Sequence, residues 1–408
     1  RESCSLSKAR SYFLEQISNF ASYLFPFFIV FMSGLYLHIP FCASRCIYCG
    51  FYSTVHPKGH IGINIRERYI SALCTELNLR RNYLANESLS TIYLGGGTPS
   101  QLLPSQLERI FYNIYEVYGC RFDDMEITME CNPDDITIEF ANSLKALPVN
   151  RISMGAQTFS DQRLQFLRRR HTSADVRRAI NLLRTVAGID NISLDLMFGF
   201  PSETLEEWRD DVDTALSLEV EHISAYSLMF EEDTPLYRML ERGETSEIDD
   251  ELYRRMYNLL IDNLTAAGYE HYEISNFAQP HRRSRHNSSY WSGVPYIGIG
   301  TAAHSFDTNS RQWNVADINQ YISALENNRL PIEGREELDA KLQYNDLITT
   351  ALRTSEGIDL TKLSPANRDY LLTCAEPHIH SRRLALGNNS LTLTREGIYI
   401  SDSIMADL

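Results

Sequence analysis

The sequence predicts an α/β protein: an open, partial barrel of six strand–helix units, followed by a smaller α+β domain with a winged-helix-like order of elements. Three observations predict this fold. Short apolar segments alternate with amphipathic segments from Leu35 to about Phe230, polar residues recur where the apolar segments end, and the pattern changes near residue 310. Six units cannot close a barrel of eight, so we expect the barrel to stay open.

The six expected strands are short runs rich in apolar residues, at 35–39, 91–94, 126–130, 151–155, 192–197 and 222–228. The expected helices lie between them, at 66–83, 104–118, 137–147, 174–186 and 205–218. Thr137 and Thr204 each precede acidic residues at the start of an expected helix, as N-terminal caps do. Strands that alternate with helices indicate a parallel sheet.

We expect four parts along the chain: an N-terminal extension at 1–32, the partial barrel at 33–230, a connecting segment at 231–308 and a C-terminal domain at 309–408. The connecting segment should hold a helix near 252–267. The C-terminal domain should hold a helix near 339–354, a shorter helical region and a hairpin that ends at 391–400.

The N-terminal extension contains an apolar run at 23–32, which is too short for a bilayer span of about 20 residues. A signal-peptide core or a transit segment would also produce such a run. Met32 directly precedes the first expected strand. We therefore expect Met32 to be the natural start and residues 1–31 to be an upstream extension.

Composition limits the classes of function. The chain has 38 basic and 53 acidic side chains and a net charge of −15, which argues against broad binding to nucleic acid or to anionic membranes. Local basic groups occur at 168–171 and 282–285. Of the eight cysteines only three cluster, which is unlike a secreted disulfide framework. We expect a cytoplasmic protein, with peripheral membrane association as an additional option.

The clustered cysteines are Cys42, Cys46 and Cys49, spaced C-x3-C-x2-C after the first expected strand. Thiolates are the usual ligands of iron–sulfur clusters. Three of them can hold three irons of a [4Fe-4S] cubane and leave the fourth open to the amino and carboxylate groups of S-adenosylmethionine (SAM). The alternatives are a zinc site completed by His38 or His56, although zinc sites usually use C-x2-C pairs, and inert buried cysteines.

Polar residues follow the other expected strands. The run Gly95-Gly96-Gly97-Thr98-Pro99 follows the second strand, Glu130 ends the third, Gln157 follows the fourth and Asp195 lies in the fifth. In barrels of this kind, chemistry gathers at the carboxyl ends of the strands. Glycines there would let the backbone approach a ligand closely. Taken singly, the glycines could form an ordinary turn, and the carboxylates could be structural acceptors.

Seven segments together resemble a known family: 36–42, 48–49, 95–99, 127–132, 151–160, 195–201 and 286–290. They are similar to the oxygen-independent coproporphyrinogen III oxidase family of radical SAM proteins, which includes the haem chaperones of the HemW type. The resemblance spans about residues 34–400.

The resemblance implies that the three cysteines bind the cluster. It also implies contacts to SAM by Tyr36, Tyr48, Gly96, Gly97, Thr98, Glu130, Gln157, Arg169 and Asp195. A carboxylate can accept from ribose hydroxyls, and an arginine can pair with the SAM carboxylate. Arg169, however, also lies in a charged run that is typical of a solvated helix face.

Two features separate the branches of the family. Phe51 stands where the oxidases have a fourth cysteine, which favours the chaperones, although Gly50 replaces the acidic residue usual in them. In the chaperone-like branch an HNxxY motif is linked to haem binding, and here it is His286 to Tyr290. Imidazole and tyrosine can both ligate haem iron. Alternatively, His286 is a packing residue beside Trp291.

We therefore expect a haem chaperone that binds a [4Fe-4S] cluster, SAM and haem and delivers haem to membrane-bound respiratory haemoproteins. The alternatives are the oxidase itself, which decarboxylates coproporphyrinogen III oxidatively, and an unrelated radical SAM enzyme. No residue is assigned as catalytic, and the sequence leaves open whether the protein is an enzyme. No nucleic-acid partner is expected. A homodimer is compatible with the sequence, which does not fix the oligomeric state.

Overall fold

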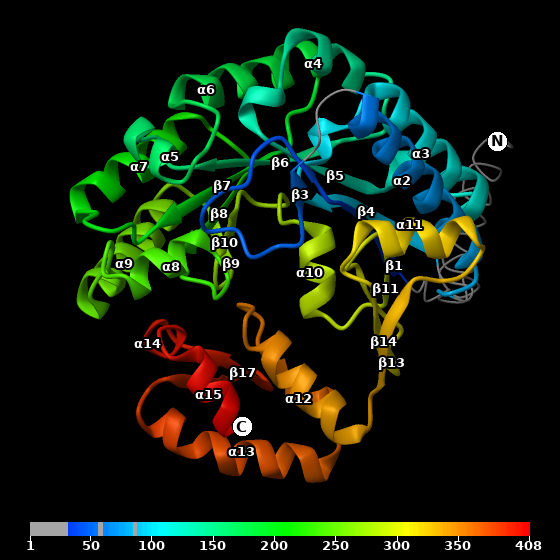
Figure 1. The fold of residues 1–408 in the computed structure, drawn as a ribbon. Helices are drawn as coiled ribbons and strands as arrows, with labels where there is room; N and C mark the ends of the chain where they lie inside the picture. Colours follow the sequence, from blue (N-terminus) through cyan, green and yellow to red (C-terminus); the bar gives the residue numbers. More distant parts are fainter. Residues whose placement is uncertain (1–31, 56–59, 85–87) are drawn as a thin grey trace, which may run out of the picture.

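The computed structural model describes residues 32–55, 60–84 and 88–408 (Figure 1). The expected extension at 1–31 and His56 lie outside the described residues. Among the helices of the described ranges, none combines the length and the hydropathy that a membrane span requires.

Six parallel strands form the predicted barrel, side by side in the order β1-β4-β5-β6-β7-β8. Their bounds are β1 Met32–Ile39, β4 Ser88–Gly96, β5 Glu126–Cys131, β6 Arg151–Gln157, β7 Ile192–Phe198 and β8 His222–Ser227. Each neighbouring pair runs parallel. The prediction of six strands is confirmed. β1 and β4 begin three residues earlier than expected, β4, β5, β6 and β7 end one or two residues later, and β8 ends one residue earlier.

Helices cover the outer face of these strands (Figure 1). They are α2 His60–Leu79, α3 Pro104–Tyr118, α4 Ile138–Leu144, α5 Asp161–Phe166, α6 Ser173–Leu182 and α7 Leu205–Ser217, with 3-10 turns at Pro99–Gln101, Phe122–Asp124 and Pro133–Asp135. Thr137 and Thr204 cap α4 and α7 as expected, because their hydroxyls accept from Phe140 N and Glu207 N. The helix expected at 174–186 consists of α6 followed directly by a π-helical turn at Leu183–Ala187, which ends at Gly188.

Side chains of the barrel strands alternate between two environments. The outward set, including Leu35, Ile92 and Ile152, is apolar and forms the core beneath the helices. We call the inward space the lumen. It is lined by Tyr36, His38, Thr91, Tyr93, Glu126, Thr128, Glu130, Arg151, Ser153, Ser193, Asp195, His222 and Ser224. Closed eight-stranded barrels fill this space with branched apolar side chains, so a polar lumen indicates a binding function rather than packing.

The sheet continues beyond the barrel into the segment expected to be a connector. Further strands are β9 Glu270–Glu273, β10 Asn276–Ala278, β11 Tyr296–Ile299, β12 His304–Phe306, β13 Ser310–Asn314 and β14 Ile332–Glu337, with helices α8 Pro235–Glu241, α9 Asp250–Ala266, α10 Arg285–Trp291 and α11 Ile318–Glu326. β10 pairs with β8 at one edge and β11 pairs with β1 at the other, which gives a 12-stranded sheet. The boundary expected at residue 309 therefore falls inside this sheet, because β13 pairs with β12 across it.

The C-terminal domain begins with α12 and has a core of its own, which includes Ile348, Leu371 and Leu391. Its elements are α12 Ala340–Ala351, β15 Ile358–Asp359, a 3-10 turn at Leu360–Lys362, α13 Pro365–His380, β16 Leu384–Gly387, β17 Ser390–Leu393, α14 Arg395–Ile398 and α15 Ser401–Asp407. The hairpin expected to reach residue 400 ends at Leu393. The hydroxyl of Thr394 accepts from Gly397 N and starts α14 there.

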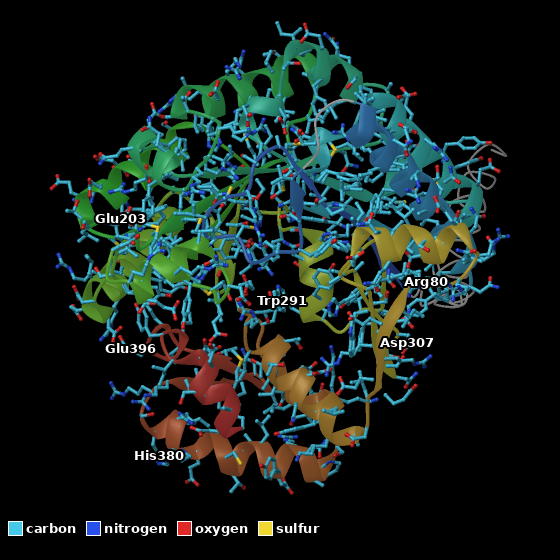
Figure 2. All side chains as sticks on the ribbon, viewed as in Figure 1. Arg80, Glu203, Trp291, Asp307, His380 and Glu396 are labelled. Carbon is cyan, nitrogen blue, oxygen red and sulfur yellow. The ribbon has the colours of Figure 1, made fainter. Side chains whose placement is uncertain are left out.

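The C-terminal domain meets the sheet along a seam next to α10. Arg353 lies over the ring of Trp291 at 4.9 Å from the ring centroid and pairs with Glu273 at 3.0 Å. Ile274 N donates to the carbonyl of Arg353 at 3.0 Å. Figure 2 shows Trp291 at the end of α10 that faces this domain. The seam thus combines a ring contact, an ion pair and a backbone hydrogen bond.

Candidate cofactor site

The three clustered cysteines lie on the loop that follows β1. This loop is closed by two short strands, β2 Phe41–Cys42 and β3 Thr54–Val55, which pair in parallel. All three side chains are partly buried free thiols. Burial raises the pKa of the Cys42 and Cys49 thiols, and the Thr98 hydroxyl, 3.6 Å from Cys42 Sγ, partly opposes this at Cys42. The loop therefore presents three thiols that are not joined in a disulfide.

The zinc alternative needs a set of ligands close enough to reach one ion. In the described part of the chain, no three His, Cys, Asp or Glu side chains stand at the spacing of ligands to one ion. Thiolates of a cubane bind different irons and so stand further apart. Both ring nitrogens of His38 are engaged, Nδ1 by Tyr36 Oη and Nε2 by the Tyr52 carbonyl, each at 3.0 Å. His38 thus has no nitrogen left to complete a zinc set.

The glycine run lies at the carboxyl end of β4, beside the cysteine loop. Gly96 has φ +110°, and its N–H donates to Glu130 Oε2 at 3.0 Å. A Cβ on Gly96 would stand 2.5 Å from the His38 ring, and one on Gly97 would stand 2.6 Å from the carbonyl carbon of Pro40. The space that a side chain would need at these two positions is occupied by the protein itself. Glycine is required here first for packing against the end of β1.

Two carboxylates lie in the lumen below this rim. Glu130 accepts from Tyr93 Oη at 2.9 Å as well as from Gly96, and burial raises its pKa to about 7. Asp195 accepts from Ser153 Oγ at 3.2 Å, and burial raises its pKa to about 6 against the opposing charge of Arg151. Both carboxylates are structural acceptors in this conformation. Glu130 also holds the backbone of the glycine run in place.

Arg169 turns into the site, although its neighbours in the charged run do not. Arg168 has φ +58°, and Arg170 is exposed and pairs with acidic residues at 2.9 Å. Arg169 Nη1 donates to Cys46 Sγ at 3.7 Å, and Nη2 donates to Asn132 Oδ1 at 2.8 Å and to the Gly155 carbonyl at 2.6 Å. Its Nε–H is buried without a partner. The solvated-face alternative is therefore wrong for Arg169.

The remaining rim residues have distinct settings. Gln157 is buried at the end of β6 with φ +67°, and the β6–β7 pairing shifts register just before it. A non-glycine residue in this conformation is strained, and such strain clusters at functional sites. Tyr48 packs at the edge of a small apolar cluster that includes Ile47 and Leu167. Tyr36 faces the lumen and reaches the rim only through His38.

His286 and Tyr290 lie away from the cysteine loop, at the opposite end of the barrel. Both His286 ring nitrogens are hydrogen bonded, Nδ1 to Thr91 Oγ1 and Nε2 to Tyr290 Oη, each at 2.8 Å. The fully buried ring also stacks on Tyr93, with centroids 5.1 Å apart. Glu126 accepts from the backbone N–H of His286 at 2.9 Å. In this conformation His286 is a packing residue, as in the alternative weighed for it.

Tyr93 is a site residue that sequence reasoning missed. Its ring contacts His286, and its hydroxyl contacts Glu130, so it joins the HNxxY motif to the glycine run. Thr91, Glu126 and Asn132 were missed in the same way. The signal was present as a period of two, since Thr91, Tyr93 and Gly95 alternate with apolar residues along one strand.

The charge state of His286 makes a testable contribution to stability. Burial, followed by the charge of Arg151, lowers its pKa to about 3 from an ordinary 6.5. Because the folded pKa is depressed, its contribution is present above pH 6.5 and is lost as the pH falls toward 3. We therefore expect the advantage in unfolding free energy of the wild type over His286→Gln to shrink below about pH 6, by about 1.4 kcal/mol per pH unit. Urea unfolding near pH 7.5 and near pH 5 measures this.

The exposed His380 provides the control, because His380→Gln should leave the pH dependence of stability unchanged. A difference between wild type and His286→Gln that is the same at both pH values would show that His286 is not held neutral.

The chain is similar to known proteins in sequence and in fold. Residues 36–215 match the model of the radical SAM superfamily. Curated relatives called heme chaperone HemW include one from Bacillus subtilis, 36% identical over 327 residues (80% of this chain and 85% of the relative), and one from Mycobacterium tuberculosis, 33% identical over 376 residues (92% and 94%). The coproporphyrinogen III oxidase HemN of Escherichia coli, described as a radical SAM enzyme, superposes with a TM-score of 0.79 at 21% identity, covering 92% of this chain and 89% of that one. At that identity the likeness concerns the fold.

Proposed function

We propose, since this chain belongs to the HemW family of haem chaperones within the radical SAM proteins, that it binds haem and passes it to a recipient haemoprotein. The recipients we propose are membrane-bound respiratory proteins. Under this proposal the protein acts in the cytoplasm, with peripheral association at the membrane where haem is handed over. We also propose that the protein can form a homodimer.

Radical SAM proteins carry a [4Fe-4S] cluster and SAM, and we infer that Cys42, Cys46 and Cys49 hold the cluster here. When bound, the cluster supplies an electron to SAM. Thr98 and Arg169 each donate a hydrogen bond to a cysteine sulfur, and hydrogen bonds of this kind orient the ligands of a metal site. The free thiols and these two donors support the assignment.

The rim of the barrel would hold SAM. Arg169 has a buried Nε–H without a protein partner, which is the donor that a carboxylate of SAM would accept from. Glu130 keeps the glycine run in place through the Gly96 amide. Tyr48 would offer ring surface near the rim, and Tyr36 would act through His38, which its hydroxyl contacts at 3.0 Å. These residues bind and orient, and no proton transfer is assigned to them.

For haem we propose His286 and Tyr290, which stand four residues apart on α10 and share a face of that helix. Both ring nitrogens of His286 are engaged in the barrel. Ligation by His286 therefore requires that the imidazole break its hydrogen bond to Thr91 or to Tyr290. To free that nitrogen, α10 has to move away from the lumen. The proposal thus includes a change in the position of α10.

The single observation that carries the chaperone over the oxidase is Phe51. Its side chain is 74% exposed next to the cysteine loop, at the position where the oxidase branch has its fourth cysteine. No thiol is available at that position. The likeness to HemN is a likeness of fold at 21% identity, whereas HemW relatives match at 33–36% identity.

Haem titration of the anaerobically reconstituted protein tests the proposal. We expect saturable binding with a Soret band in the wild type and weaker binding in His286→Ala, because the imidazole ligand is lost. His380→Ala, at an exposed position, is the matched control and should bind as the wild type does. Absence of saturable binding by the wild type would count against the chaperone function.

A second assay addresses the oxidase. Supplying coproporphyrinogen III, SAM and a reductant without oxygen should leave the porphyrinogen unchanged. Formation of protoporphyrinogen IX would establish the oxidase instead.

A further inference from the structure

Thr128 on β5 and Arg151 on β6 stand directly opposite each other in the parallel ladder, and both face the lumen. Their exposed fractions are 0% and 1%. Thr128 Oγ1 and Arg151 Nε are buried and have no hydrogen-bond partner in the structure. No carboxylate of the described residues forms an ion pair with Arg151. Two adjacent, fully buried polar groups are thus left without a protein acceptor.

The rest of the lumen does not share this property. Thr91 bonds His286, Ser193 bonds His222, and Ser153 bonds Asp195. The neighbouring carboxylates are already in use, because Glu126 accepts from the amides of α10 and Asp195 from Ser153. Buried polar groups in native proteins are nearly always paired, and a buried cation without an acceptor is strongly unfavourable. An acceptor from outside the protein would remove this penalty.

The positive charge of Arg151 affects ionisable groups on other strands that line the lumen and on α10. Beyond the effect of burial, it lowers the pKa of Asp195, His222 and His286. Both histidines are held neutral by burial, so they add no positive charge. The site therefore carries one positive charge, with Asp195 and Glu126 at its borders.

We propose that Arg151 and Thr128 form a binding site for a carboxylate inside the barrel. The guanidinium offers a planar fork of N–H groups that matches the two oxygens of a carboxylate, and the threonine hydroxyl offers a further donor. A monovalent group matches the single positive charge better than a phosphate dianion does, because the bordering carboxylates repel a dianion more strongly.

The carboxylate has two possible sources. One is a propionate of the haem, and this source rests on the proposed function. His286 lies close to the site, because its partner Thr91 pairs in the ladder with Glu126, two residues before Thr128 on β5. The other is a small free carboxylate, which does not depend on haem binding at all. The two sources give different results in the experiments below.

The first experiment uses formate as the probe and the anaerobically reconstituted full chain. Thermal unfolding midpoints are compared in sodium formate and in sodium chloride of equal ionic strength. For a free carboxylate we expect formate to raise the wild-type midpoint by several degrees more than chloride, because a ligand stabilises the state that binds it. The rise should vanish in Arg151→Met and shrink in Thr128→Val. Arg81→Met, which removes the same charge from an exposed position, should respond as the wild type does.

The second experiment compares haem with its dimethyl ester, in which both propionates are blocked. For a haem propionate we expect esterification to weaken binding to the wild type by roughly tenfold or more. Arg151→Met should bind the two ligands equally, while Arg81→Met should discriminate as the wild type does.

Either result supports the site and identifies its source. If haem fails to bind, the proposed function fails, and the formate experiment alone decides the site. The site itself is overturned if formate and chloride act alike on the wild type and Arg151→Met does not alter any discrimination against the ester. Because apolar replacements of buried charges are often neutral or stabilising, Arg151→Met should fold. Thr128→Val, which retains the arginine, provides the same test if it does not.

Discussion

Cys46→Ser is expected to abolish cluster binding when the protein is reconstituted anaerobically with iron and sulfide. A serine hydroxyl is a poor replacement for a thiolate, and two remaining cysteines cannot hold a cubane that already has one iron without a protein ligand. Arg169 would also lose the sulfur that its Nη1 contacts. Iron and sulfide analysis should fall from about four of each per chain to near zero. The charge-transfer absorbance of the cluster should disappear together with them.

Cys374→Ser is the matched control, because Cys374 is a partly buried thiol in the C-terminal domain, remote from the loop. It should retain its iron. Full iron content in Cys46→Ser would show that the loop is not the cluster site, and stoichiometric zinc in place of iron would favour the single-ion alternative.

Glu76→Gln is expected to lower the free energy of unfolding by about 3–5 kcal/mol, the largest stability effect that we predict. The Glu76 side chain is fully buried and pairs with Arg80, which is 2% exposed, at 3.2 Å. It also accepts from Gly300 N at 2.9 Å and from Asn314 Nδ2 and Tyr321 Oη at 2.7 Å. Neutralising it leaves the Arg80 cation buried and puts an amide N–H₂ among donors. Urea unfolding at neutral pH measures the loss.

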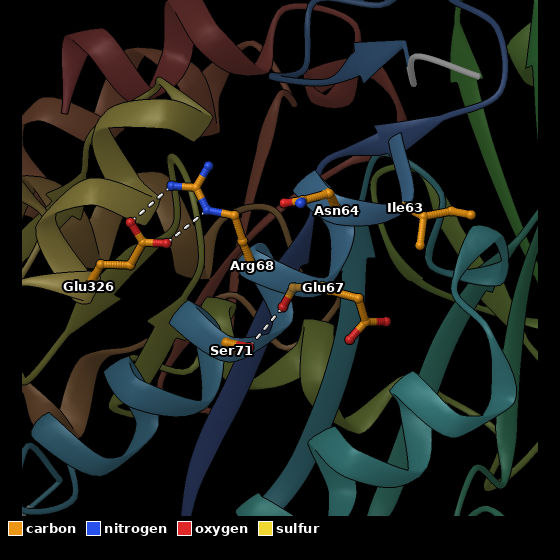
Figure 3. A pocket seen from close by; sticks show the side chains of 6 residues that line it. All are labelled: Ile63, Asn64, Glu67, Arg68, Ser71 and Glu326. Atoms are coloured by element: carbon orange, nitrogen blue, oxygen red, sulfur yellow. Dashed lines mark hydrogen bonds and ion pairs between the residues drawn. The ribbon is translucent and has the colours of Figure 1, made fainter. Parts of the chain in front are cut away.

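Glu326→Gln is the control from the same region. Glu326 pairs with Arg68 at 2.8 Å beside an open surface hollow lined by Ile63, Asn64, Glu67, Arg68, Ser71 and Glu326 (Figure 3). Both side chains of that pair are 48% exposed, so solvent screens the interaction and the unfolding midpoint should hardly move. Equal effects of the two substitutions would mean that the buried Glu76 network contributes no more to stability than the exposed pair does.

The barrel could be predicted from the sequence because its strands are local signals. Each is a short apolar run, and the residues at the carboxyl ends, such as Glu130 and Asp195, interrupt the pattern at the right place. The joining of β11 to β1 could not be predicted in the same way. Those strands are paired across a large separation in sequence, and a four-residue run such as Tyr296–Ile299 does not specify its partner.

The kind of site could be predicted from the sequence, but the positions of its side chains could be predicted only in part. The cysteine spacing predicts a ligand loop whatever the fold, and the structure shows free thiols at those three positions. The inward turn of Arg169 depends on the backbone conformation of Arg168, which a charged run conceals. The burial of His286 depends on Thr91 and Glu126, two residues of other strands that nothing in the motif itself identifies.

The helix α10 has seven residues and is anchored at both ends. His286 is held in the lumen by Thr91, and Trp291 is held at the seam under Arg353 (Figure 2). One short helix therefore joins the buried imidazole to the contact with the C-terminal domain. A displacement of that domain that carried Trp291 with it would strain the hydrogen bond between His286 and Thr91.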